Sequence, residues 1–394
     1  MQSAVVSIPK IQRVVSIDVL RGLVMIIMAL DHVRDYFHAA SFVHPPLDLT
    51  TTSPAIFLTR WITHFCAPVF VFLAGTSAFL ISGRKTKKQL SKFLFTRGLW
   101  LIIVEVIIIT FGWTFDVHYT FIGLQTIWAL GVGMIALSVL IFLPLRLLLV
   151  LGLIFIAGHN AFDNFHVAGN GVDAIGWSVL HEQKGFAFGP FNVFIAYPVL
   201  SWIGVMTLGY CFGEFYTRFN AEQRKRIFIQ LGISCILVFI LLRSADIYGD
   251  ANHWAVQKNM LFSILSFINV TKYPPSLLYI LITLGPAILF LAFTEKKLSS
   301  AGKVVSVYGR VPMFYYILHI YIIHLAAILT AHAWGYTWSQ VITNPFLNPL
   351  VGFGFPLWIV YLIWMSLVVF LYHFCKIYDR YKLSHKQYWW LSYL

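Results

Sequence analysis

The stretch LVMIIMALDHVRDYFHAA, residues 23–40, begins like a membrane-spanning helix and ends in a cluster of ionisable side chains. Five such residues follow the apolar run 23–30: Asp31, His32, Arg34, Asp35 and His38. On a helix, Asp31, Asp35 and His38 share one face, and His32 and Asp35 are i, i+3 neighbours. A charged group inside a span costs about 2.5–3.5 kcal/mol on insertion scales, so it usually faces a cavity and serves a function. The stretch therefore predicts either a reaction centre at the end of a span or an ion-pair cluster that caps the helix.

The composition of the whole chain indicates a membrane protein. Of its 394 residues, 59% are hydrophobic and 11% are charged, whereas soluble domains carry about 25% charged residues. A helix needs about 20 mostly apolar residues to cross a bilayer. About ten such segments are present, near 15–37, 54–82, 93–113, 120–143, 145–160, 196–217, 225–243, 275–294, 308–333 and 353–375. We expect an all-α, polytopic integral membrane bundle that forms one domain over residues 1–394.

The net charge of +13 is unevenly distributed along the chain. Lysines and arginines gather at 84–92, 218–226, 296–310 and 376–386. If the chain crosses the bilayer ten times, these segments all lie on one side, and the positive-inside rule makes that side cytoplasmic. Both termini are then cytoplasmic, and the opposite side receives loops near 38–53, 114–119, 161–195, 244–274 and 334–352. The basic charge therefore indicates topology rather than nucleic-acid binding.

Histidines also occur inside predicted spans. His64 and His319 are candidates for a shared centre, whereas His324, five residues after His319, diverges from it by roughly 140° on a helix. An Asp beside a His can fix its tautomer and raise its basicity, as general-base chemistry requires. A buried histidine can equally be a hydrogen-bonded packing residue, and both interpretations stay open for each ring.

Other kinds of site find no support in the sequence. The four cysteines lie inside predicted spans without metal-type spacing: Cys66, Cys211, Cys235 and Cys375. The chain contains no phosphate-binding loop, no GxSxG or HExxH motif, and no GxGxxG motif that opens a Rossmann unit. We therefore expect no metal, and the intramembrane histidines are the best candidates for chemistry.

Several segments resemble the heparan-α-glucosaminide N-acetyltransferase catalytic-domain family, in particular its bacterial members. The segments occur in the order RVVSIDVLRGLVMIIMALDH (13–32), LTRWITHFCAPVFVFLAGTSAFL (58–80), YPVLSWIGVMTLGYCFGE (197–214) and YGRVPMFYYILHI (308–320). The start also resembles membrane acyltransferases that modify cell-surface polysaccharides. Their first span typically reads Asp, two residues, Arg-Gly, and then a His fourteen positions after the Asp. Asp18, Arg21-Gly22 and His32 stand at that spacing.

The resemblance implies acyl transfer across a membrane. Acetyl-CoA would enter from the cytoplasm, and its acetyl group would reach an amine or hydroxyl of a sugar or glycan on the other side. His32 would be the general base or acyl carrier. Further site residues would be Asp31, Arg34, Asp35, His64 and His319. Mammalian relatives hold a key histidine in the first outer loop, so His38 and His44 remain alternatives to His32.

The resemblance also implies partners. CoA is a polyanion, so arginines at a cytoplasmic mouth would hold its phosphates by charge-assisted contacts. The candidates are Arg21, Arg84, Arg97 and Arg310. The expected setting is a lipid bilayer, which for a bacterial member is the inner membrane, and the sequence leaves open whether the chain forms a homodimer.

Two other functions compete with acyl transfer. A proton-coupled transporter or flippase would use Asp31, Arg34, Asp35 and Glu105 as a proton relay, although no inverted repeat is visible in the sequence. A haem protein would bind its iron between histidines of different helices. The acetyltransferase is the main prediction.

Overall fold

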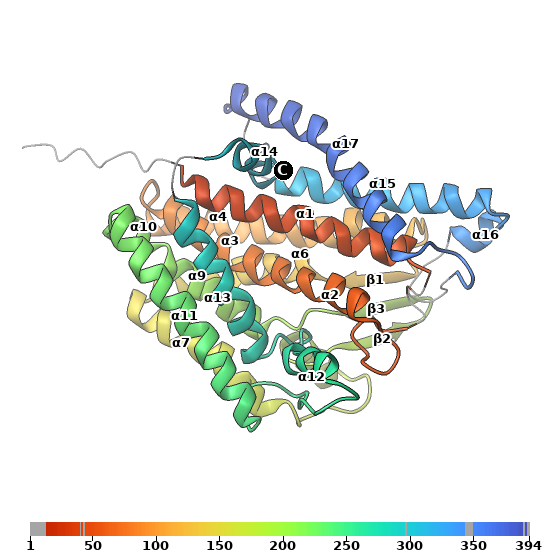
Figure 1. Cartoon of the computed structure of the whole chain (residues 1–394). Coiled ribbons are helices and arrows are strands. Elements are labelled where there is room, and N and C mark those ends of the chain that lie inside the picture. Colours follow the sequence, from red (N-terminus) through yellow and green to blue (C-terminus); the bar gives the residue numbers. More distant parts are fainter. Residues whose placement is uncertain are drawn as a thin grey trace, which may run out of the picture.

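The computed structural model describes residues 13–39, 41, 44–295, 298–342, 350–388 and 391, and helices dominate it (Figure 1). Lys296 and Lys297, which belong to one predicted cytoplasmic segment, lie outside the described residues. The longer helices are α1 (Val15–Phe37), α3 (Cys66–Ser82), α4 (Lys87–Ile103), α6 (Thr126–Leu140), α7 (Leu145–Gly158), α9 (Leu200–Phe212), α11 (Ala221–Ala245), α13 (Leu277–Thr294), α14 (Ser300–Arg310), α15 (Pro312–Ala333) and α17 (Leu357–Ser384). The shorter helices are α2 (Pro54–Ile62), α5 (Thr110–Thr114), α8 (Val172–Leu180), α10 (Glu214–Arg218), α12 (Met260–Ile268) and α16 (Trp338–Val341).

Seven helical stretches among the described residues are long and apolar enough to cross a membrane. They are Pro54–Ser82, Lys87–Thr114, Leu145–Phe162, Ala221–Ala245, Leu277–Thr294, Pro312–Ala333 and Leu357–Ser384. Of the other three expected spans, α1 has 23 residues but carries charges at both ends, while α6 has 15 residues and α9 has 13. A mostly helical membrane protein is thus confirmed with seven candidate spans, and the count of ten stays a prediction.

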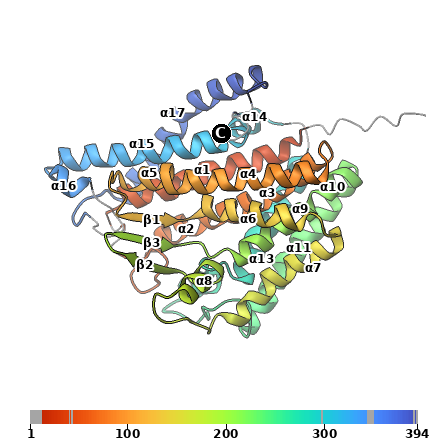
Figure 2. The ribbon, with the colours of Figure 1, turned by 180° about the vertical axis from the view of Figure 1, so that it is seen from behind.

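The helix α1 packs against α3, α14, α15 and α17 (Figures 1 and 2). Its approach to α14 is close because each helix presents a glycine to the other. A Cβ on Gly22 would lie 2.0 Å from the carbonyl oxygen of Val305, and a Cβ on Gly309 would lie 1.8 Å from that of Asp18. Only glycine fits at such distances. The contact lets Arg21 donate a hydrogen bond to the Gly309 carbonyl at 3.1 Å.

The predicted span 54–82 is interrupted at His64. The helix α2 ends at Ile62, a 3₁₀ turn covers Thr63–Phe65, and α3 begins at Cys66. Pro68 has no N–H to give to the carbonyl of His64, four residues earlier. Tyr279 of α13 donates its hydroxyl to that carbonyl instead, at 2.7 Å. The break in the helix is therefore satisfied by a neighbouring helix.

Glu105 explains where α6 begins. It lies in a π-helical segment, Val104–Ile109, between α4 and α5, and its side chain is fully buried. The backbone N–H of Trp128 donates to its carboxylate at 2.9 Å, whereas Gln125, the N-cap residue of α6, makes no side-chain capping bond. A carboxylate from another helix thus caps α6, because a helix N-terminus favours negative charge.

A small sheet corrects the all-α prediction. The strands are β1 (Phe121–Leu124), β2 (Lys184–Phe188) and β3 (Phe191–Ile195), in the order β1-β3-β2. β3 runs parallel to β1 and antiparallel to β2, with Gly123 opposite Phe194 and Phe186 opposite Val193. The sheet lies at the opposite end of the helical bundle from α10 (Figures 1 and 2). Residues 184–195, expected as part of a loop, form two of its three strands.

Candidate functional site

Two imidazoles meet where α1 packs against α15. The Nδ1 atom of His32 lies 2.7 Å from Nε2 of His319, and the two ring planes are nearly parallel, 10° apart, with 4.9 Å between centroids. Both side chains are buried. The ring of Trp113 in α5 packs edge-on against His32, with 4.9 Å between centroids. The two helices thus hold the pair from both sides.

The hydrogen bonds assign the tautomers of this pair when both rings are neutral. Nδ1 of His319 lies 2.9 Å from the carbonyl oxygen of Tyr315, which can only accept, so His319 carries its proton on Nδ1. Nε2 of His319 is then the acceptor, and His32 donates to it from Nδ1. The lone pair of His32 therefore lies on Nε2, the form that a general base or nucleophile needs.

Two carboxylates and two guanidiniums form a network beside His32. Asp31 lies 3.0 Å from Arg34 and 3.1 Å from Arg60, and Arg34 also pairs with Asp35. Arg60 further donates to the Thr63 hydroxyl at 2.7 Å. The formal charges of the two Asp–Arg pairs cancel, which lowers the free-energy penalty of burying them. The three predicted residues of α1 do lie together, and Arg60 from α2 joins them.

A cavity of about 320 Å³ lies beside this network, and we call it the polar cavity. Its lining includes Asp31, His32, Arg34, Asp35, Arg60, Trp113, Gln125, Tyr197, Lys272, Tyr273 and Tyr316. These side chains come from α1, α2, α5, α15 and the segments before α6, α9 and α13. The cavity therefore offers hydrogen-bond donors, acceptors and cations to a small polar group placed next to His32.

A second cavity, of about 350 Å³, lies along α1 toward its N-terminal half, and we call it the basic cavity. Its cationic lining residues are Arg21, Arg97, Arg310 and Lys382, and most other lining residues are apolar. Four side chains line both cavities and form the partition between them: Met28, Phe70, Thr126 and Tyr316. A molecule in the basic cavity would thus reach the neighbourhood of His32 across one layer of side chains.

The four arginines predicted to hold CoA all border this end of the bundle. Arg84 lines a third cavity of about 450 Å³, which shares Arg21 with the basic cavity. Arg310 is held by Asp379 of α17 through hydrogen bonds of 2.7–3.0 Å. Its charge is thus already neutralised by the protein, and the basic cavity is also lined by Arg97 and Lys382.

The remaining predicted histidines lie elsewhere. His64 is buried against Tyr279, and neither of its ring nitrogens makes a hydrogen bond within the described part of the chain. His44 is exposed. Burial and the nearby Arg34 lower the pKa of His38, which follows the last residue of α1. Among the described residues, none of these three lines the polar cavity.

The divergence of His319 and His324 follows the helical geometry. His319 faces His32, while Nδ1 of His324 lies 3.0 Å from the carbonyl oxygen of Gly112 in α5. His324 also packs against Phe115, with 4.6 Å between ring centroids. The two histidines of α15 therefore contact different helices. His319 contacts His32, which lines the polar cavity, whereas His324 contacts α5.

Lys272 and Tyr273 line the polar cavity but were not singled out from the sequence. Burial raises the pKa of Tyr273, but Lys272 and Arg60 outweigh it, so that the pKa lies below its usual value. A sequence signal existed, because Lys272 stands in a loop on the side where the charge rule expects few lysines. Arg60 could likewise have been recognised as the cation needed to balance two carboxylates.

The arrangement combines a neutral imidazole lone pair, nearby cations and two adjoining cavities of different character. Such a centre can remove a proton from an acceptor, or carry a group, while cations stabilise negative charge that develops on oxygen. It does not suit haem at this pair, because iron between two imidazoles would separate their nitrogens by about 4 Å, twice a metal–imidazole bond, and the observed distance is 2.7 Å.

Fold and site together define a polytopic helical membrane protein with a buried histidine pair beside one of two adjoining cavities. A family model described as heparan-alpha-glucosaminide N-acetyltransferase, catalytic, matches residues 13–248. This range is more than half of the chain, so the chain belongs to that family and is a membrane acetyltransferase by membership. The matched range contains His32, whereas His319 follows it. No curated protein matches the chain.

Proposed function

We propose that the protein transfers an acetyl group from cytoplasmic acetyl-CoA to an amine or hydroxyl of a sugar or glycan on the other side of the membrane. The single observation that carries the proposal is the position of the His32–His319 pair, beside the polar cavity and next to its partition from the basic cavity. The proposal includes ten spans with both termini cytoplasmic, and the inner membrane of a bacterium as the setting.

The basic cavity suits the donor. The phosphates of CoA carry several negative charges, and Arg97 and Lys382 offer cations for them at its wall. The rest of the lining, for example Met25 and Leu101, suits the less polar arm that bears the thioester. With the phosphates at these cations, the thioester would extend toward Tyr316 and the polar cavity.

The chemistry needs one proton acceptor. In direct transfer, Nε2 of His32 takes a proton from the acceptor as its nitrogen or oxygen attacks the thioester carbonyl. The C–S bond then breaks, and the thiolate recovers the proton to leave as CoA. In a two-step route, Nε2 itself attacks and CoA leaves as the thiolate. The acceptor then attacks the acetyl-imidazole, neutral imidazole is released, and the proton lost by the acceptor passes to the thiolate. In both routes Arg60 and Lys272 supply positive charge for the oxyanion.

The sharpest test of this proposal distinguishes acetyl transfer from transport. Purified protein is incubated with acetyl-CoA and with small amino sugars, and the release of CoA thiol is followed with a thiol reagent. We expect release that depends on the protein and rises with an acceptor. Proton-coupled uptake into liposomes without any CoA release would instead support the transporter and overturn the acetyltransferase.

A histidine series tests the assignment of the site within that function. His32→Ala and His319→Ala should lower CoA release, because one removes the base and the other removes the acceptor that fixes its tautomer. His38→Ala, His44→Ala and His64→Ala are matched controls, since their rings do not line the polar cavity. Loss of activity in His44→Ala with full activity in His32→Ala would move the reaction to the first outer loop.

A further inference from the structure

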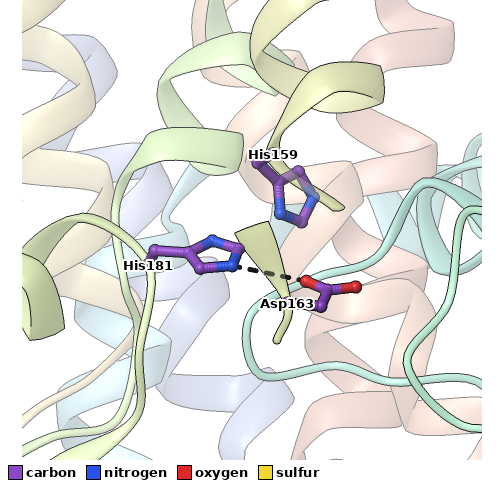
Figure 3. Close-up of side chains that lie close together, drawn as sticks. All are labelled: His159, Asp163 and His181. Atoms are coloured by element: carbon purple, nitrogen blue, oxygen red, sulfur yellow. Dashed lines mark ion pairs between the residues drawn. The ribbon is translucent and has the colours of Figure 1, made fainter. Parts of the chain in front are cut away.

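Outside the histidine pair, three potential metal ligands converge near the sheet end of the bundle. They are His159, Asp163 and His181, whose ligand atoms all lie within 4.8 Å of one another (Figure 3). His159 begins a 3₁₀ turn, His159–Phe162, after α7, and Asp163 follows that turn. His181 immediately follows α8. Segments about twenty residues apart in the chain thus direct two imidazoles and one carboxylate into one space.

The hydrogen bonding of these groups is incomplete. His159 and His181 are 1% and 4% exposed. Among the described residues, neither ring nitrogen of His159 makes a well-formed hydrogen bond, although one of them faces the Pro275 carbonyl, and Nδ1 of His181 has no partner. A buried polar atom without a partner destabilises the folded state, because it has lost its hydrogen bonds to water and gained none in return. The two rings lie side by side, with 5.3 Å between their centroids. A bound cation that accepts a lone pair from each ring would satisfy them.

Neighbouring residues also hold the Asp163 carboxylate in position. The side-chain amide of Asn160 donates to Oδ2 of Asp163 at 2.8 Å, and Oδ1 of Asp163 lies 3.3 Å from Nε2 of His181. Asn160 is fixed in turn, because its Oδ1 accepts a bond from the backbone N–H of Leu277 at 3.0 Å. An outer contact that orients a ligating carboxylate is typical of metal sites.

We propose that His159, Asp163 and His181 bind a divalent transition-metal ion, with zinc as the expected occupant. Two imidazoles and one carboxylate are ligands that zinc favours, whereas calcium and magnesium prefer oxygen ligands alone. Ligand atoms at about 2.0–2.1 Å from a tetrahedral zinc lie about 3.4 Å apart, which is close to the 3.3 Å between Asp163 and His181. Three protein ligands leave a fourth position for water or for another ligand.

The surroundings supply charge and access. A cavity of about 280 Å³ borders Asp163 and His181 and is also lined by Glu182 and Tyr273. Glu182 brings a second carboxylate, whose Oε2 is buried without a hydrogen-bond partner in the described part of the chain. Two carboxylates balance the charge of a divalent ion. Tyr273 also lines the polar cavity, so the metal would lie on the far side of that side chain from His32.

The metal would join the end of α7 to the end of α8 and, through Asn160 and Leu277, to the start of α13. It rests on different residues from the proposed acetyl transfer, so the two claims can fail separately. Protein is purified without a histidine tag, stripped with a chelator, and titrated with Zn²⁺ against a competing dye, while Co²⁺ serves as a spectroscopic probe.

We expect one equivalent of Zn²⁺ and a visible absorption band with Co²⁺ that indicates four-coordinate geometry. Loss of an outer contact to a metal ligand costs about 10–100-fold in affinity, so loss of a ligand should cost at least about 100-fold. His181→Gln and Asp163→Asn should therefore abolish tight binding. His253→Gln is the matched control, because the His253 side chain is 69% exposed and does not line this cavity.

Folded protein that binds less than about a tenth of an equivalent would overturn the proposal, and so would equal Zn²⁺ affinity in His181→Gln and in the unchanged chain. Asp163→Asn guards against misfolding as the cause of lost binding, because the amide is nearly the same size and can still accept the Asn160 hydrogen bond. Each variant is checked by its elution volume and melting temperature before titration.

Discussion

Two clusters of buried polar side chains, one around His32 and one around His159, differ in how far their polar atoms have partners. Around His32, both carboxylates and both guanidiniums take part in ion pairs, and each imidazole nitrogen in the pair contact has a defined role. Around His159, the rings retain nitrogens without partners. A closed network of this kind fixes the geometry of one reactive atom, whereas an open set of ligand atoms creates a place for an ion. Burial alone therefore does not tell which kind of site a histidine belongs to.

The largest effect is expected from opening the closed network. Arg60→Ala removes one of the two cations paired with Asp31 and leaves that carboxylate less compensated inside the bundle. Removing one partner of a buried ion pair costs about 3–5 kcal/mol of stability. We expect a marked fall in melting temperature and in the yield of folded protein, measured by scanning fluorimetry in detergent.

The control for that change is Arg226→Ala. Arg226 pairs with Glu222 on the surface, where both side chains are more than three-quarters exposed, and such pairs contribute at most about 1 kcal/mol. Equal melting temperatures for the two variants would show that the network around Asp31 is not the closed, buried system described above.

A smaller effect is expected at the basic cavity. Arg97→Gln should weaken CoA binding about tenfold, because a hydrogen bond to a charged group is worth about 1.5–3 kcal/mol. Arg310→Gln should act mainly on stability, since it leaves Asp379 without its partner. Calorimetry at low salt measures the affinity, and raising the salt should weaken it further. A stronger loss of affinity in Arg310→Gln would reverse the proposed roles of the two arginines.

The smallest effect is expected when the metal is removed. Chelation should lower the melting temperature, because an ion that binds only the folded state stabilises it. Acetyl-CoA turnover should change by no more than about twofold, since independent sites contribute additively. Turnover that falls in parallel with metal content, and recovers with Zn²⁺, would show that the two clusters act as one site.

The sequence predicted the residues on one helix better than the contacts between helices. Spacing alone placed Asp31 and Asp35 on a common face of α1. It could not show that Arg60 completes the network, or that His319 rather than His64 faces His32, because these depend on how α2 and α15 pack. His64 falls at a 3₁₀ turn, where helical periodicity stops applying.

The errors in the fold have similar causes. The segment 120–143 is mostly apolar, but its first residues pair with β3 and the rest forms a helix that is capped by Glu105 from another segment. The hairpin of β2 and β3 turns at Gly189, whose φ of +60° suits glycine. In the sequence, two segments that contain phenylalanines flank the Gly-Pro pair at 189–190, and this pattern could have predicted the hairpin. The ligand set of His159, Asp163 and His181 has no motif spacing, so only the fold brings it together.

The central claim is that the lone pair on His32 performs the proton or acetyl transfer, and one comparison tests it most directly. CoA release and CoA affinity are measured side by side for His32→Ala and for the unchanged chain. General-base histidines contribute about 10²–10⁴-fold, so turnover should fall by at least about 100-fold while CoA affinity and melting temperature stay nearly constant. Asp35→Asn should lower turnover more weakly, because it alters the charge network and keeps the imidazole. Full turnover in His32→Ala would contradict the account.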